Sequence, residues 1–383
     1  MVSVFQSIGR IVYGTGAAAK IGDEARRLDC KRVLIITDKG LTANNIHKAV
    51  QEPLEAAGIS TAVFSDVVLD PTLASIEEST KAALDFGADC LVGLGGGSAL
   101  DSTKAAALHC SHPGPLEQYF GINLVPSACL PTILIPTTAG TGSEMTSISV
   151  LTDASGDSKK GIVSDYLYAK AALLDPGLTL TLPPYHTAIT GLDAFVHAME
   201  SFVNLTATPF TDALNRESMR IIAANIRKAY ANGADIRARE QLLYASALSG
   251  IGFSNTQNGV IHALGMAVPT KYHLPHGLLM AAIAPMGIAF NAMASPEKYA
   301  EVAEILGSAP AGADTLTRAK SAAQGFAVLL EDLGIQAGLQ AHGVSWDDLA
   351  GTAERAAGTA RLMSNNPRKG SAKELLALLQ QNF

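Results

Sequence analysis

The stretch "CLVGLGGGS" (residues 90–98) indicates the fold more clearly than any other part of the chain. It joins an apolar run, typical of strands buried on both faces of a sheet, to three consecutive glycines. The residues that follow, "ALDSTKAAA" (99–107), have the composition of a helix that begins at about Ser98. A strand, a glycine turn and a helix in succession form one step of a parallel α/β sheet, so we expect an α/β fold.

Further steps of the same kind lie on both sides of this stretch. We expect strands within residues 31–40, 60–68 and 132–144, with further strand-like runs in "SISVLTD" (147–153) and "AALLDP" (171–176). Helices are expected near residues 43–58 and 72–87. Because strands that alternate with helices pair in parallel, these segments predict one parallel sheet.

The character of the sequence changes after "DPGLTLTLPP" (175–184), where two prolines interrupt the chain. Beyond this point we find Ala- and Leu-rich periodic segments and hardly any strand-like runs. Helices are expected at residues 187–204, 208–232, 236–252, 259–267, 276–292, 297–306, 313–333 and 346–357. We therefore expect an α/β domain at 1–182 and an all-helical domain at 183–383, with the cleft between them as the site.

Composition excludes several classes of function. The 383 residues are 48% hydrophobic and only 16% charged, which describes a well-buried globular protein. A formal net charge of -7 argues against nucleic acid or an anionic membrane as the main partner. No signal peptide or membrane-spanning run is found, and the four cysteines have no C-x-x-C spacing, so we expect a cytoplasmic protein with reduced thiols.

The glycine turn at 95–98 is suited to binding a phosphate. Missing side chains let backbone N–H groups approach the anion, and the start of the next helix adds a favourable dipole. The turn matches neither the Rossmann G-x-G-x-x-G motif nor the P-loop, so an ordinary tight turn is the alternative. A second Gly/Thr turn in "PTTAGTGSE" (136–144) follows another strand, and two such turns suggest a diphosphate held between strand ends.

Asp38 ends the strand "VLIITD" and has two interpretations. An acidic side chain there can accept hydrogen bonds from an adenosine ribose and repel a 2'-phosphate, which favours NAD over NADP. Alternatively, Asp38 only caps the turn that follows.

The helical half contains a candidate metal site. In "GLDAFVHAMESF" (191–202), Asp193 and His197 lie four residues apart, so both side chains occupy one helix face. His262 and His276 lie in or beside later apolar segments, and His273 flanks the second of them. A single buried histidine is more often a core residue, but an unpaired buried carboxylate would be costly unless a cation compensated it. Three nitrogens and one oxygen suit Fe(II), Zn, Mn or Co.

Together these segments resemble the iron-dependent (group III) alcohol dehydrogenases over nearly the whole chain. The resemblance lies in "GGGSALDSTKAAA", "PTTAGTGSE", "GLDAFVHAMESF", "GFSNTQNGVIHALGMAVP" and "YHLPHG", in the family's order. It implies a dehydroquinate synthase-like architecture, an NAD cofactor, one divalent metal (Fe(II) first, Zn second) and a homodimer or larger homo-oligomer. The implied metal ligands are Asp193, His197, His262 and His276. The implied cofactor-binding residues are Asp38, Gly95, Gly96, Gly97, Ser98, Asp101, Thr137, Thr138, Gly140, Thr141 and, in the lysine pair before "GIVS", Lys159.

Two departures from the family pattern concern the substrate and the proton path. Many members have a second histidine four residues after the third ligand, where this chain has Met266, whose thioether cannot carry a proton. His273, a water or a ribose hydroxyl would then relay the proton, or the pocket is reshaped for a particular substrate. In addition, Thr256, Gln257 and Asn258 replace small or apolar residues, which favours a hydroxylated or acidic substrate unless they bind neighbouring backbone instead.

The resemblance implies reversible hydride transfer between NAD(H) and a small alcohol or aldehyde, with the metal polarising the substrate oxygen. Maleylacetate-reductase-like and glycerol-dehydrogenase-like enzymes are the closest alternatives. A dehydroquinate-synthase-like lyase would need clustered cations for a polyanionic substrate, and the site motifs contain almost none. A metal- and NAD-binding protein with impaired turnover is the non-catalytic alternative.

Overall fold

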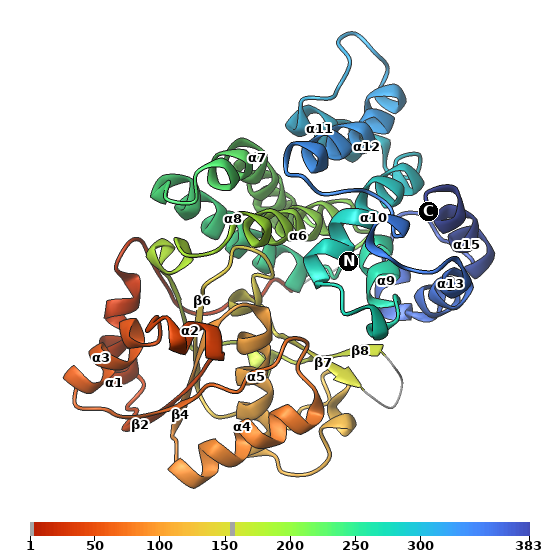
Figure 1. Ribbon diagram of the computed structural model, residues 1–383. Coiled ribbons are helices and arrows are strands. Elements are labelled where there is room, and N and C mark those ends of the chain that lie inside the picture. Colours follow the sequence, from red (N-terminus) through yellow and green to blue (C-terminus); the bar gives the residue numbers. More distant parts are fainter. Residues whose placement is uncertain (1–3, 154–157) are drawn as a thin grey trace. The chain divides into compact units, whose positions relative to one another are not determined.

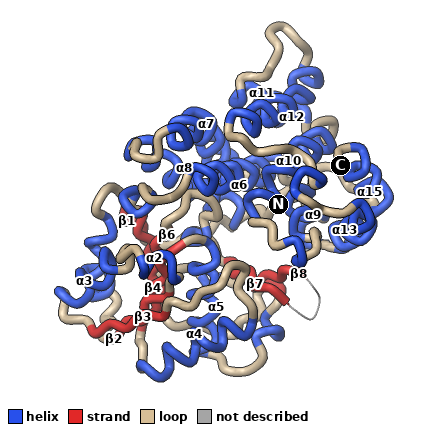
Figure 2. Tube along the Cα trace, in the orientation of Figure 1, coloured by secondary structure: helices blue, strands red, loops and turns tan. Residues whose placement is uncertain are grey.

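The computed structural model describes residues 4–153 and 158–383 (Figure 1). The chain divides into two compact units. We call Gln6–Leu182 the sheet unit, and Pro183–Phe383 together with Val4 and Phe5 the helical unit. Figure 2 shows the strands gathered in the sheet unit.

The sheet unit is built on a six-stranded sheet in the order β1-β9-β6-β4-β2-β3. All its paired strands run parallel, so the expected parallel sheet is confirmed. Its strands are β1 (Ile11–Tyr13), β2 (Arg32–Ile36), β3 (Ser60–Phe64), β4 (Cys90–Gly95), β6 (Thr132–Pro136) and β9 (Ala171–Leu174). Its helices are α1 (Ile21–Arg27), α2 (Lys39–Ala43), α3 (Lys48–Ala56), α4 (Leu73–Phe86) and α5 (Gly97–Ser111).

Strand β2 shows why the sheet forms. Val33 and Ile35 pack into one apolar cluster, whereas Leu34 and Ile36 pack into another. Side chains alternate across a strand, so a run that is apolar at every position must be covered on both faces. The buried sheet leaves the ends of its strands, including the glycine turn after β4, to carry polar chemistry.

A smaller sheet was not expected from the sequence, and the run at 147–153, which was expected in the parallel sheet, belongs to it instead. It has the order β5-β8-β7, with β5 at Gly121–Ile122, β7 at Ile148–Asp153 and β8 at Ser158–Val163. Strands β7 and β8 pair antiparallel, and β5 pairs with β8 in parallel. The first half of β8 contains two lysines, and this polarity hides the strand from a search for apolar runs.

In the helical unit, the described residues from Pro183 onward form helices and turns. These helices are α6 (Pro184–Val203), α7 (Pro209–Ala231), α8 (Ile236–Ser254), α9 (Val260–Met266), α10 (His276–Asn291), α11 (Pro296–Leu306), α12 (Thr315–Asp332), α13 (Leu349–Gly358), α14 (Ala360–Met363) and α15 (Ala372–Gln381). The first eight match the expected segments, and α14 and α15 were not expected. None of the helices in the described residues combines the length and apolar character that crossing a bilayer requires.

Candidate functional site

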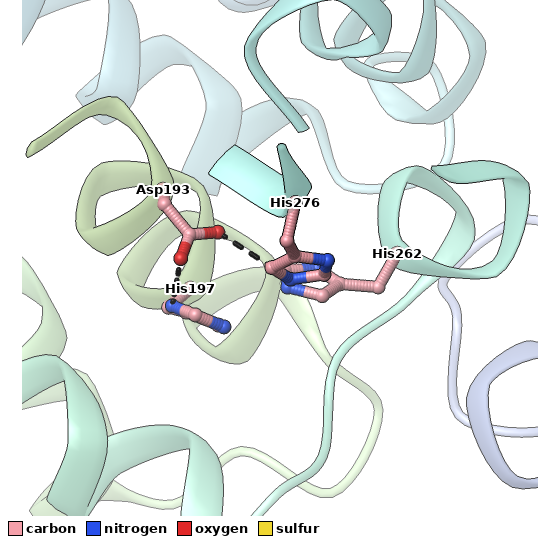
Figure 3. Close-up of side chains that lie close together, drawn as sticks. All are labelled: Asp193, His197, His262 and His276. Atoms are coloured by element: carbon pink, nitrogen blue, oxygen red, sulfur yellow. Dashed lines mark ion pairs between the residues drawn. The ribbon is translucent and has the colours of Figure 1, made fainter. Parts of the chain in front are cut away.

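Four side chains from three helices converge in the helical unit (Figure 3). Asp193 and His197 come from α6, His262 from α9 and His276 from the first position of α10. One donor atom from each lies within 4.8 Å of the other three. Asp193 Oδ2 is 3.8 Å from His197 Nδ1, and Asp193 Oδ1 is 3.7 Å from His276 Nε2. We call these four residues the Asp/His cluster.

A glycine lets the helices of the cluster approach each other. A Cβ atom on Gly277 would lie 2.4 Å from the carbonyl oxygen of Ile189 and 3.4 Å from Cβ of Asp193. Contacts below 3.0 Å are not tolerated between packed atoms, so only glycine fits there. Gly277 follows His276 directly, and the close approach of α10 to α6 brings that imidazole to Asp193.

Glu200, which sequence reasoning missed, orients His262. Its buried carboxylate accepts a hydrogen bond from His262 Nδ1 at 2.6 Å and another from the backbone N–H of Ile261 at 2.6 Å. Because a carboxylate only accepts, the ring proton lies on Nδ1, and the lone pair of Nε2 is free for another group. That Nε2 is buried and has no hydrogen-bond partner in the part of the chain that the structure describes.

These features fit a divalent metal ion. A buried imidazole nitrogen with an unused lone pair, beside a buried carboxylate and two further imidazoles, is the donor set of Fe(II) and Zn sites. A carboxylate behind a ligating histidine is the usual second element of such sites. The sequence signal for Glu200 was its spacing, because residues 193, 197 and 200 share one face of α6.

Phe253, Met266 and His273 lie close to the Asp/His cluster in sequence or in space. The ring of Phe253 stacks on His197, with centroids 4.4 Å apart. Met266 is the last residue of α9, one helical turn beyond His262, and is partly exposed. His273 is exposed in a left-handed conformation (φ 50°) at the end of the turn Thr270–Tyr272 and is not among the four clustered residues.

The polar residues of the loop between α8 and α9 make two kinds of contact. Thr256 is buried and forms a hydrogen bond with Ser201 Oγ at 2.7 Å, so it binds its surroundings, as one interpretation held. Asn258 is also buried. Gln257 differs, because its side-chain oxygen accepts a hydrogen bond from the guanidinium of Arg361.

In the sheet unit, the two Gly/Thr turns pack against each other. A Cβ atom on Gly97 would lie 2.6 Å from Cγ2 of Thr141, and one on Gly96 would lie 3.4 Å from Cγ2 of Thr138. Gly95 has φ +151°, and a Cβ atom there would lie 2.7 Å from Cβ of Ala99. The glycines therefore permit both the turn and the contact with the second turn, which leaves bare backbone at the start of α5.

The remaining expected cofactor residues lie around these turns. Asp101 accepts hydrogen bonds from Ser143 Oγ and from the backbone of Val150, which joins α5 to the second turn. Ser98 Oγ accepts from the backbone N–H of Asp70, whose carboxylate is 2.6 Å from Lys159 Nζ. The structure thus brings Ser98 and Lys159 to the same aspartate. Thr137 and Gly140 belong to the second turn and are buried.

Asp38 caps a helix, as its second interpretation held. Its Oδ1 accepts from the backbone N–H of Leu41 at 3.0 Å at the start of α2. Its Oδ2 lies beside the first glycine turn, 3.8 Å from where a Cβ atom on Gly95 would stand. The capping geometry leaves that second oxygen available, so both interpretations are compatible with one position.

Two buried ionisable side chains, Lys104 and Glu144, lie at the second turn. Lys104 is fully buried, donates to the backbone oxygen of Ser143 at 3.0 Å and has its pKa lowered by burial. Burial raises the pKa of Glu144 to about 7, and Lys104 only partly offsets this. Both groups are shielded from water, so this part of the sheet unit keeps ionisable side chains in a low-dielectric interior.

Comparison with known families decides the assignment. Residues 9–176 match the family described as iron-containing alcohol dehydrogenase. Residues 187–383 match the C-terminal region of the Fe-containing alcohol dehydrogenase family. The chain belongs to the iron-containing alcohol dehydrogenase family. It is an NAD-dependent alcohol oxidoreductase, so the expected family and enzyme class are confirmed.

Individual relatives cover the whole chain. A sulfoacetaldehyde reductase from Bilophila wadsworthia is 50% identical over 385 residues, which is 100% of both proteins. The crystal structure of a 1,3-propanediol oxidoreductase is 34% identical and superposes with a TM-score of 0.97 over 100% of both chains. A sulfoacetaldehyde reductase from Bifidobacterium kashiwanohense, solved in complex with NAD+, is 26% identical with a TM-score of 0.86, covering 100% of this chain and 99% of the other. The expected α/β and all-helical architecture is that of these structures.

Proposed function

We propose that the chain is a metal-dependent reductase that transfers a hydride from NADH to a small anionic aldehyde, with sulfoacetaldehyde as the favoured substrate. In that reaction the carbonyl carbon gains a hydride and the oxygen gains a proton, so aldehyde, NADH and H+ become alcohol and NAD+. The reverse reaction oxidises the alcohol.

The observation that carries the proposal is the Asp/His cluster with its oriented His262. We propose that Asp193, His197, His262 and His276 hold one divalent ion, Fe(II) first and Zn second. Such an ion would supply Lewis-acid polarisation of the substrate oxygen. The protein fixes the ligands before the substrate binds: Glu200 holds the ring proton of His262 on Nδ1, and Phe253 stacks on His197 and keeps water from that face of the ring.

The cofactor NAD(H) is assigned to the sheet unit. We propose that residues 1–182 form the NAD-binding domain and 183–383 the metal- and substrate-binding domain. The diphosphate would lie against Gly95, Gly96, Gly97, Ser98 and the threonine turn of Thr137, Thr138, Gly140 and Thr141, supported by Asp101 and Lys159. The tight packing of Gly97 on Thr141 supports this, because it exposes backbone N–H groups at the start of a 15-residue helix. Asp38, whose Oδ2 lies beside Gly95, would accept from the adenosine ribose.

The substrate proposal rests on the 50% identical relative, named a sulfoacetaldehyde reductase. Identity of that level over the full length of both chains supports a shared substrate class. Of the polar residues at 256–258 that distinguish this chain from the family pattern, Gln257 holds the guanidinium of Arg361, and this supports a charged substrate rather than a plain aliphatic one.

A proton donor must complete the product. Met266 cannot supply a proton, and we propose that His273 passes one from solvent, consistent with its exposure. A His273→Gln variant should then lose rate most strongly at alkaline pH, where proton supply limits the reaction. An unchanged pH–rate profile would leave water as the donor.

We further propose a cytoplasmic homodimer or larger homo-oligomer. The four cysteines are free thiols, which supports a reducing compartment. Light scattering of the purified protein tests the assembly, and a monomeric mass would contradict it.

A panel of aldehydes tests the substrate. With NADH and Fe(II) present, sulfoacetaldehyde should show a kcat/KM about 10-fold or more above that of 3-hydroxypropanal and lactaldehyde, because a charged head group adds binding energy that neutral analogues lack. A higher kcat/KM for 3-hydroxypropanal would instead favour a propanediol dehydrogenase, the activity named for the 34% identical structure.

A further inference from the structure

Arg361 is a cation for which the described residues supply no carboxylate partner. It lies on the short helix α14, and its Nη1 donates to the neutral side-chain oxygen of Gln257. Four other arginines of the helical unit form ion pairs: Arg216 with Glu301, Arg227 with Asp332, Arg318 with Glu304 and Arg368 with Glu374. In the described residues no carboxylate lies within ion-pair distance of Arg361, and desolvation alone lowers its pKa.

The surroundings of Arg361 are those of a binding residue. Its side chain is enclosed enough by protein to be desolvated, yet it remains partly exposed and can be reached by a small molecule. A guanidinium does not lose its proton in proteins, so burial without a counter-charge is costly until an anion arrives. The planar guanidinium matches the oxygens of a sulfonate or carboxylate in a bidentate geometry.

Contacts connect Arg361 to the Asp/His cluster. Helix α14 packs against α9, which carries His262. The backbone N–H of Gln257 donates to the carbonyl oxygen of Phe253 at 2.8 Å, and the ring of Phe253 stacks on His197. Arg361 is therefore linked through two residues to the imidazole of a proposed metal ligand.

The loop holds Gln257 in an unusual conformation that aims its side chain. Gln257 has φ 73°, a left-handed value that costs a non-glycine residue about 1–3 kcal/mol. Its backbone oxygen accepts from Asn204 Nδ2 at 3.2 Å and from Thr256 Oγ1 at 2.9 Å, and these bonds fix the conformation. Backbone strain maintained in this way is frequent in ligand-binding loops.

We propose that Arg361, positioned by Gln257, binds the anionic head group of the aldehyde whose carbonyl reacts at the Asp/His cluster. This inference rests on the proposed function and deepens it: the substrate class is an aldehyde with a sulfonate or carboxylate on the adjacent carbons, and Arg361 determines that specificity. Gln257 is a positioning residue, since it acts through Arg361.

Steady-state kinetics of Arg361→Gln tests the proposal against a charged and a neutral substrate. For sulfoacetaldehyde we expect KM to rise and kcat/KM to fall about 100-fold, whereas for propionaldehyde both should stay within about 3-fold. Arg361→Lys, which keeps the charge but not the bidentate geometry, should recover about 10-fold of the loss. Arg227→Gln, which breaks a surface ion pair of the same unit, is the matched control. It should leave KM and kcat/KM unchanged for both aldehydes.

Several results would overturn the proposal. An equal loss for both aldehydes, with a lower thermal midpoint, would show that Arg361 is structural. A rise in KM for NADH alone would assign it to the cofactor. Succinic semialdehyde carries a carboxylate in place of the sulfonate. If Arg361→Gln loses kcat/KM for only one of the two anionic aldehydes, the head group of that aldehyde is the one that Arg361 binds.

Calorimetric titration of ethanesulfonate into NAD+-loaded protein gives a readout that does not depend on turnover. The parent and the Arg227→Gln control should bind it, and Arg361→Gln should bind about 100-fold more weakly. If the parent fails to reduce sulfoacetaldehyde but binds ethanesulfonate through Arg361, the proposed substrate is wrong and the anion site stands. If the parent reduces sulfoacetaldehyde and Arg361→Gln behaves like the parent, only the role of Arg361 is wrong.

Discussion

Replacing Glu200 by glutamine should weaken metal binding without changing any proposed ligand. Glu200 accepts two short hydrogen bonds, from His262 Nδ1 and from the backbone N–H of Ile261, each at 2.6 Å, besides a longer one from the backbone N–H of His262 at 3.4 Å. A glutamine has one acceptor oxygen, so its NH₂ group must face one of these two atoms. Facing Nδ1, the NH₂ group would donate to it and move the ring proton of His262 to Nε2, the nitrogen that the metal needs.

The size of the effect follows from one lost charge-assisted hydrogen bond. Such bonds contribute about 1.5–3 kcal/mol, and ~1.4 kcal/mol corresponds to a factor of ten, so metal affinity should fall about 10- to 100-fold. Competition with a chromophoric chelator measures the dissociation constant for Zn or Co(II), with Glu217→Gln, an exposed change on α7, as the control. Equal affinity in Glu200→Gln and the parent would refute the claim that Glu200 sets the tautomer of His262.

Three further predictions follow from the described geometry. Gly97→Ala should weaken NADH binding about 10-fold or more, because the new Cβ would lie 2.6 Å from Thr141 Cγ2; adding Thr141→Ser, which removes that methyl group, should restore part of the affinity in a fluorescence titration. Glu144 has its pKa raised from 4.5 to about 7, so the folded state holds the proton more tightly, and the resulting stability is full below pH ~4.5 and lost as the pH rises through ~7. At ~1.4 kcal/mol for each pH unit of that window, Glu144→Gln should gain up to about 3 kcal/mol over the parent at pH 8 and nothing below pH 4.5, and equal urea midpoints at pH 8 would contradict this. Met266→His should speed aldehyde reduction about 10-fold or more if proton transfer limits the parent, and a variant no faster on any aldehyde would refute the relay argument.

Local patterns decided how much of the fold was predictable. The strand at 90–95 and the pair Asp193 and His197 were predictable, because burial on both faces and a spacing of four leave direct marks in a sequence. The expected helix at 43–58 corresponds to α3, which begins five residues later, at Lys48, because Asn45 takes a left-handed φ of 56° between α2 and α3. No composition signal marks that break, because asparagine is tolerated in both conformations.

The parts of the candidate site that were missed depend on tertiary contacts. Glu200 shares a helix face with Asp193 and His197, but its role becomes visible only when α9 brings His262 to it. Arg361 lies on a four-residue helix, which cannot form alone and which is held by packing against its neighbours. The partner of a side chain 62 or 104 residues away is set by the fold, and a single sequence does not contain it in readable form.

Metal removal tests the central claim most directly. The protein is stripped with a chelator, dialysed, and assayed for NADH oxidation with sulfoacetaldehyde before and after Fe(II) or Zn is returned, with bound metal counted by mass spectrometry. We predict one ion per chain, activity that falls at least about 100-fold on stripping and returns with the metal, and no recovery in Asp193→Ala. Equal rates in the stripped and reloaded protein would contradict the claim that the Asp/His cluster is a catalytic metal centre.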